Sequence, residues 1–158
     1  MKKSNVTYED SFNGRPIMTD RDNDLGCDVK ILRRSSDVFE NYLDRHSRTY
    51  CLRFDLQYPQ NSDCDQDVRK FKKFSSSFAK NLSRKGFEPA FVWVKERHNS
   101  NHDHVHMQLF LNGRTTNNIH NHIQKANELW NKTNGKSKNY RGLVNDCTKD
   151  SNGQPQHN

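Results

Sequence analysis

The sequence predicts an α+β fold in which an antiparallel sheet carries helices on one face. Two apolar, strand-like stretches flank a short polar turn, as in a β-hairpin. Amphipathic stretches with helical spacing separate this hairpin from an alternating stretch before it and a short apolar stretch after it. The resulting order is strand, helix, strand, strand, helix, strand.

Composition limits the class of protein. The 158 residues are enough for a single core, and their net charge of +7 favours a polyanionic partner, nucleic acid before membrane. No apolar run is long enough to span a bilayer, and the start MKKSNVTYEDSFNG lacks the apolar core of a signal peptide. The scattered cysteines form no C-x-x-C pair, which disfavours structural zinc and a disulfide framework. We therefore expect a cytoplasmic protein without a membrane partner.

The chain begins with a polar segment. Residues 1–34 show no sustained period, and we interpret them as an N-terminal arm. A capped helix is predicted over 35–46, where Ser-Asp precedes apolar residues at helical spacing. The domain proper is predicted over 35–147, followed by a polar, disordered tail over 148–158.

The first predicted strand and helix of the sheet follow. A strand over 48–59 alternates apolar and polar residues and stops at Pro59. A helix over 65–86 has acidic residues at its start and Gly86 at its end, as caps and the helix dipole prefer. Its apolar stripe consists of Val68, Phe71, Phe74 or Ser75, Phe78 and Leu82.

The hairpin and the second helix complete the pattern. Strands over 89–97 and 104–112 are predicted to turn at about Ser100. A helix over 115–135 starts with Thr115 or Thr116 as N-cap, and a short fourth strand lies within 141–147. This order is the ferredoxin-like βαββαβ plan, with the sheet face opposite the helices left open.

The open face carries the candidate site. In the predicted register Glu96 lies opposite His104, and His106 shares their face. Two imidazoles and a carboxylate suit a divalent ion, Mn²⁺ or Mg²⁺, that keeps positions open for phosphate oxygens. Such an ion would polarise a scissile phosphate. The alternative is a polar sheet face without a metal.

Other residues are candidates for contact with DNA. Arg53 and Asp55 either form a salt bridge on the open face, or Asp55 approaches the metal and Arg53 a phosphate. Together with Val92, Phe110 is predicted to offer a surface on which bases stack. The full set of predicted DNA-contacting residues is Arg53, Asp55, Gln57, Gln108 and Phe110.

Further residues have a structural interpretation. Trp93 and Trp130 are predicted to belong to the core, and His120 and His122 to a solvated helix face. The basic residues of the helix over 65–86 either form a solvated face or follow a DNA backbone.

The motif His104-Val105-His106, with Glu96 eight residues before it, resembles the signature of HUH endonucleases, which nick single-stranded DNA. RFDLQYP, FVWVKER and HVHMQLFLNG together resemble the inovirus gene-two-product (YagK/YfjJ-type) family of phage and prophage replication proteins, from about residue 48 to residue 147. The resemblance implies a rolling-circle replication initiator in a bacterial host. It would bind single-stranded or hairpin origin DNA, hold Mn²⁺ or Mg²⁺ through Glu96, His104 and His106, and work beside host replication proteins.

Two departures from the family pattern affect the nuclease interpretation. The resemblance implies that a tyrosine attacks the phosphate, often in Tyr-x-x-x-Lys on a helix after the last strand, and no tyrosine here starts such a motif. Either the chain is an N-terminal portion or the nucleophile has been lost. Within this sequence the candidate nucleophile is Tyr140, the only tyrosine near the last strand. Gln57 also stands where relatives often carry His. The alternative function is a non-catalytic single-stranded nucleic-acid-binding module on the same scaffold.

Overall fold

The structure is a computed structural model that describes residues 5–60, 67–96, 102–116 and 118–148. The chain divides into two compact units, Met1–Asn41 and Tyr42–Asn158. Helix α1 (Val29–Arg45) contributes residues to both units. Nearly all of the predicted tail over 148–158 lies outside the described residues.

The first unit contains two short antiparallel ladders. β1 (Val6–Thr7) pairs with β4 (Cys27–Asp28), and β2 (Ser11–Phe12) pairs with β3 (Arg15–Pro16). The turn between β2 and β3 is Asn-Gly, and Asn13 and Gly14 both have positive φ, 49° and 73°. This is the chemistry that two-residue hairpin turns require. The segment interpreted from the sequence as an N-terminal arm therefore contains two short ladders.

Helix α1 starts six residues before the predicted start at residue 35. The Oδ1 atom of Asp28 accepts hydrogen bonds from the backbone N–H groups of Lys30, at 2.8 Å, and Ile31, at 3.0 Å. These bonds satisfy N–H groups that have no partner within a helix, as an N-cap does. The predicted cap at Ser-Asp lies in the middle of the helix.

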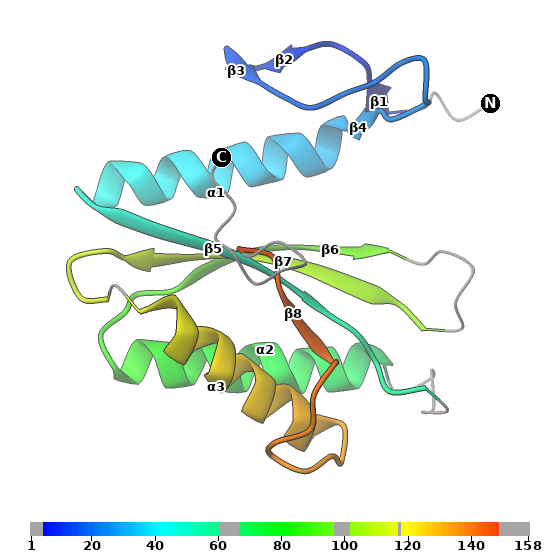
Figure 1. Cartoon of the computed structure of the whole chain (residues 1–158). Coiled ribbons are helices and arrows are strands. Elements are labelled where there is room, and N and C mark those ends of the chain that lie inside the picture. The colour runs from blue at the N-terminus through cyan, green and yellow to red at the C-terminus, as the bar shows by residue number, and fades with distance from the viewer. Residues whose placement is uncertain (1–4, 61–66, 97–101, 117, 149–158) are drawn as a thin grey trace. The chain divides into compact units, whose positions relative to one another are not determined.

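The second unit is built on a four-stranded antiparallel sheet with the strand order β6-β7-β5-β8. Its elements are β5 (Thr49–Leu56), α2 (Asp67–Arg84), β6 (Ala90–Glu96), β7 (His104–Asn112), α3 (Ile119–Thr133) and β8 (Val144–Asp146). Helices α2 and α3 lie on the same face of this sheet (Figure 1). The predicted α+β class and the predicted order of strands and helices are confirmed.

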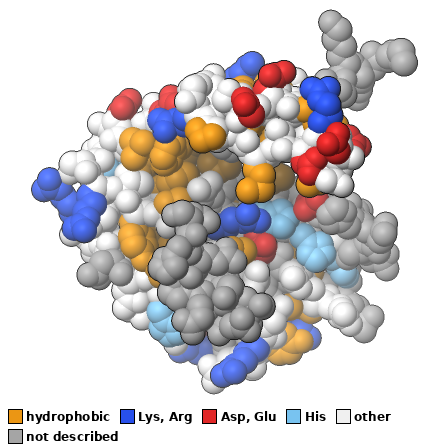
Figure 2. Space-filling view, turned by 45° about the horizontal axis from the view of Figure 1, so that its top comes forward, with side chains coloured by type: hydrophobic (Ala, Val, Ile, Leu, Met, Phe, Trp, Pro, Cys, Tyr) orange, Lys and Arg blue, Asp and Glu red, His pale blue; other side chains and the backbone are white. Residues whose placement is uncertain are grey.

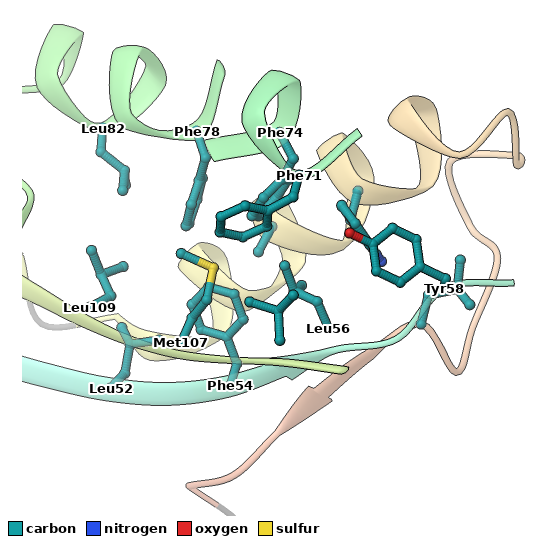
Figure 3. Close-up of a cluster of buried hydrophobic side chains, with 14 of the residues drawn as sticks. Leu52, Phe54, Leu56, Tyr58, Phe71, Phe74, Phe78, Leu82, Met107 and Leu109 are labelled. Atoms are coloured by element: carbon teal, nitrogen blue, oxygen red, sulfur yellow. The ribbon is translucent and has the colours of Figure 1, made fainter. Parts of the chain in front are cut away.

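The core lies between this sheet and the two helices (Figure 3). The Phe78 ring meets Phe54 edge-on at a centroid distance of 6.0 Å, and Trp130 meets Tyr58 at 5.0 Å. Trp130 is 0% exposed, as predicted, whereas Trp93 is 50% exposed at the edge strand β6. Alternation on β5 and β7 and the helical stripe of α2 thus produce one shared core.

The first turn of α2 differs from its prediction. Val68 is 50% exposed, while the preceding Asp67 is 1% exposed. The Tyr58 hydroxyl donates a hydrogen bond to the backbone oxygen of Asp67, at 2.7 Å. Because neighbouring helical residues point about 100° apart, the inward position of Asp67 turns Val68 towards solvent.

Within the described residues, no helix is both long and apolar enough to cross a membrane.

Helix α3 also departs from its prediction at the N-terminus. Its N-cap is Asn118 instead of Thr115 or Thr116, and its Oδ1 atom accepts from the backbone N–H of Asn121, at 3.1 Å. His122 was predicted to be solvated but is only 5% exposed, with its ring edge-on to Phe87 at 5.1 Å. The predicted end near Gly135 is confirmed, since the C-cap is Asn134.

Candidate functional site

The β6–β7 hairpin places the predicted metal ligands on one face. Glu96 and His104 are Cα partners across the hairpin, as predicted. On the other side of β7, His106 is the Cα partner of Asp55 on β5. Near the centre of the face in Figure 2, histidine side chains lie beside a basic and an acidic side chain. Three adjacent strands therefore contribute to one polar cluster.

His106 is held between two carboxylates. Its Nε2 atom lies 2.8 Å from Oε2 of Glu96, and its Nδ1 atom lies 2.9 Å from Oδ1 of Asp55. The two contacts come from opposite sides, because Glu96 is on β6 and Asp55 is on β5. We define Asp55, Glu96, His104 and His106 as the carboxylate–histidine cluster.

The electrostatics of His106 reflect competing effects. Burial by itself lowers the pKa of His106, because it disfavours the charged imidazole. The hydrogen bonds and the negative charges of Asp55 and Glu96 outweigh burial, and they raise the pKa of His106 above its ordinary value of 6.5. The cluster therefore stabilises a positive charge on this ring.

Asp55 is also in contact with other groups on the same face. Its Oδ1 atom lies 3.7 Å from Nε of Arg53, so the predicted ion pair is present. Its Cα partner on β8 is Asn145. Burial, followed by the charge of Asp55, raises the pKa of the nearby Cys147 thiol to about 11. The contact between Asp55 and His106 was not predicted, because β5 and β7 are separated in the sequence by α2 and β6.

The cluster has ligand atoms but no assembled metal site. Among the residues that the structure describes, no group of three or more His, Cys, Asp or Glu side chains is placed to hold a metal ion. Nδ1 of His106 and Oδ1 of Asp55 are both buried and lie 2.9 Å apart. They face each other as an ion pair. The donor types suit a hard divalent cation with open positions.

The predicted DNA-contacting residues separate into exposed and buried ones. Arg53, Gln57 and Gln108 are exposed, and the Nε2 group of Gln108 donates to the Cys51 sulfur at 3.1 Å. Phe110 is only 1% exposed, because its ring packs against Tyr42 at a centroid distance of 5.9 Å.

Val92 is likewise buried, at 9% exposure. The prediction that Phe110 and Val92 offer a stacking surface is therefore wrong. Stacking needs an accessible ring face.

Tyr140 lies away from the cluster. It is 41% exposed and belongs to the segment between α3 and β8, which lies on the helix side of the sheet in Figure 1. Its backbone oxygen accepts hydrogen bonds from the side chains of Asn127 and Asn131 on α3. The structure therefore does not bring Tyr140 together with the predicted metal ligands.

Comparisons with known proteins identify the family. The model of the YagK/YfjJ C-terminal domain matches residues 7–139. This match includes most of the first unit, whereas the resemblance noted in the sequence began at about residue 48. A search of the curated proteins and a search of the solved structures found no match. The chain belongs to the YagK/YfjJ C-terminal domain family.

Proposed function

We propose that the chain is the metal- and DNA-binding domain of a phage or prophage rolling-circle replication initiator of the HUH type. The observation that carries this proposal is the carboxylate–histidine cluster. It gathers two acidic and two imidazole side chains from β5, β6 and β7 on the sheet face opposite α2 and α3. The substrate would be single-stranded or hairpin origin DNA, in accord with the net charge of +7.

The arrangement of the second unit supports this assignment. Read as β8-β5-β7-β6, the strand order places the fourth, first, third and second strands of the unit side by side. Under the proposal this is the ferredoxin-like plan that the HUH interpretation requires. The face opposite the helices is where a DNA strand would lie.

Glu96, His104 and His106 would hold Mn²⁺ or Mg²⁺. Glu96 would exchange its contact with His106 for a contact with the ion, while Asp55 keeps the His106 ring oriented from the other side. The ion would polarise a scissile phosphate and help to neutralise the charge that develops on it. Arg53 and Gln108, exposed on the same face, would contact the DNA backbone.

The reaction would be nicking and religation through a tyrosine. In such a reaction the tyrosine oxygen bonds to the phosphorus, the DNA strand leaves with a free 3′ hydroxyl group, and the phosphotyrosine bond keeps the phosphate available for religation. We do not assign this role to Tyr140, because its backbone oxygen is bound by Asn127 and Asn131 of α3, which packs on the other face of the sheet.

A non-catalytic single-stranded nucleic-acid-binding module is the alternative. The position of Tyr140 favours this alternative, because its backbone is bound to α3 and not to the carboxylate–histidine cluster. The burial of Phe110 and Val92 weighs against it, because sheet-based modules of this kind stack bases on exposed aromatic rings.

The test measures binding of a fluorescent hairpin oligonucleotide to the chain. Fluorescence anisotropy reports the binding, once with Mn²⁺ and once with EDTA. We expect Mn²⁺ to tighten binding to the wild-type chain and to leave binding to the His104→Ala, His106→Ala double variant unchanged. His120→Ala is the matched control, because this histidine is exposed on α3. Equal binding with Mn²⁺ and EDTA would favour the non-catalytic module, and no binding would contradict both functions.

A further inference from the structure

A second site candidate lies away from the carboxylate–histidine cluster. A pocket of about 230 Å³ lies between the C-terminal end of α2 and the N-terminal end of α3. It is smaller than the roughly 300–1,000 Å³ of typical pockets for drug-sized ligands. Its lining includes Asn81, Lys85, Thr116, Asn121, His122 and Lys125.

The pocket carries positive charge. Its described lining includes two lysines and no acidic residue. Lys125 pairs with Glu128 at 3.1 Å, but the same carboxylate also pairs with Lys138 at 3.2 Å. One negative charge is therefore shared by two ammonium groups. Lys85 forms no ion pair within the part of the chain that is described, so its charge is not compensated locally.

The rest of the lining supplies neutral hydrogen-bonding groups. His122 is buried, and its Nε2 atom lies 2.6 Å from the Thr116 hydroxyl. Burial, followed by the nearby charge of Lys85, lowers the pKa of His122, so its ring favours the neutral form. The amide groups of Asn81 and Asn121 add donors. The pocket therefore combines two cations with several neutral polar groups.

We propose that this pocket binds a phosphate group. A phosphate carries several acceptor oxygens and more than one negative charge in a small volume, which matches two lysines and a polar lining. The group could be free phosphate or part of a nucleic-acid strand, since the chemistry recognised is the same. The proposal does not depend on the function proposed for the carboxylate–histidine cluster, because the two sets share no residue.

The test follows backbone amide resonances by NMR while inorganic phosphate is added at constant ionic strength and without a divalent metal. We expect phosphate to shift the amides of residues 115–125. We expect the Lys85→Gln variant to bind phosphate about fivefold more weakly, as for the loss of one exposed charge contact. Lys85→Arg is expected to retain binding, because it keeps the charge.

Lys72→Gln is the matched control, since Lys72 is exposed on α2, which ends directly before Lys85, and does not line the pocket. Equal weakening by Lys72→Gln and Lys85→Gln would show general attraction to a basic surface and would overturn the proposal. The absence of shifts at residues 115–125 would also overturn it. Dispersed spectra of each variant show that it is folded.

Two oligonucleotides identify the source of the phosphate. A short single strand with a 5′-phosphate and the same strand without it are titrated in the same way. Pocket shifts with both strands indicate a backbone phosphate, and shifts with only the first indicate a terminal phosphate. Shifts with inorganic phosphate alone indicate a free ion. A failure of Mn²⁺ binding at the cluster would leave each of these results unchanged.

Discussion

Asp55 and His106 are Cα partners on neighbouring strands, and Oδ1 of the carboxylate lies 2.9 Å from Nδ1 of the imidazole. This contact fixes one side of the His106 ring and leaves Nε2 directed towards Glu96. A carboxylate in this position typically orients a histidine for metal binding. The consequences of the contact can be measured without a metal.

Replacement of Asp55 by Asn is expected to lower the pKa of His106, because it removes one of the two carboxylates that outweigh burial. Since the folded-state pKa of His106 is raised above 6.5, the charged ring stabilises the fold fully below about pH 6.5. This contribution is lost as the pH rises through the folded-state pKa. A proton NMR titration of the imidazole resonances in both proteins measures the shift. An unchanged His106 pKa in Asp55→Asn would contradict the account.

The pKa of His122 is expected to be shifted in the opposite direction to that of His106. Burial and then Lys85 lower its pKa below 6.5, so the unfolded chain binds this proton more readily than the folded chain. Its contribution to stability is present above about pH 6.5 and is lost as the pH falls through the folded-state pKa. The same NMR titration should show the His122 ring still mostly neutral at pH 6.5, the ordinary pKa of a histidine. Half protonation of His122 at or above pH 6.5 would mean that its ring is solvated.

Phe74→Ala is expected to lower the free energy of unfolding by about 3–5 kcal/mol, because it removes a fully buried ring from the core. Val68→Ala is the matched control on the same helix. Val68 is 50% exposed, so we expect a change within about 0.5 kcal/mol. Urea denaturation compares the two variants with the wild-type chain. A large loss from Val68→Ala would instead support the apolar stripe predicted from the sequence.

Asp28→Ala is expected to destabilise the start of α1 by about 1 kcal/mol, through loss of the two hydrogen bonds to Lys30 and Ile31. Asp37→Ala tests the start predicted from the sequence, since Asp37 is exposed in the middle of the helix. Hydrogen exchange of the amides of residues 30–33 reports the difference. Faster exchange is expected only in Asp28→Ala, and an equal effect of Asp37→Ala would place the helix start elsewhere.

The sequence predicted the features that depend on local patterns. Alternation and the short polar turn placed Glu96 opposite His104, which the strand register confirms. The contact of Asp55 with His106 depends on the pairing of β5 with β7, and no short turn joins these two strands. This pairing joins segments that are distant in the sequence, which a local pattern does not contain.

The remaining errors have a similar cause. The strand alternation placed Phe110 on the face opposite the helices, but its burial there comes from Tyr42, which is distant in the sequence. The sequence pattern places His122 on the polar side of its helix. In the structure its ring is buried against Phe87, which comes from another segment of the chain. In the first unit the Asn-Gly turn is a local signal for a hairpin, but it stands among polar residues without a sustained period.

The most direct test of the proposed metal site is calorimetric titration of Mn²⁺ into the chain and into the His104→Ala, His106→Ala double variant. The measurement does not require a nucleophilic tyrosine or a known DNA site. We predict that the wild-type chain and the His120→Ala control bind Mn²⁺ and that the double variant does not. Absence of binding to the wild-type chain, or equal binding to the double variant, would contradict the claim that Glu96, His104 and His106 hold a divalent ion.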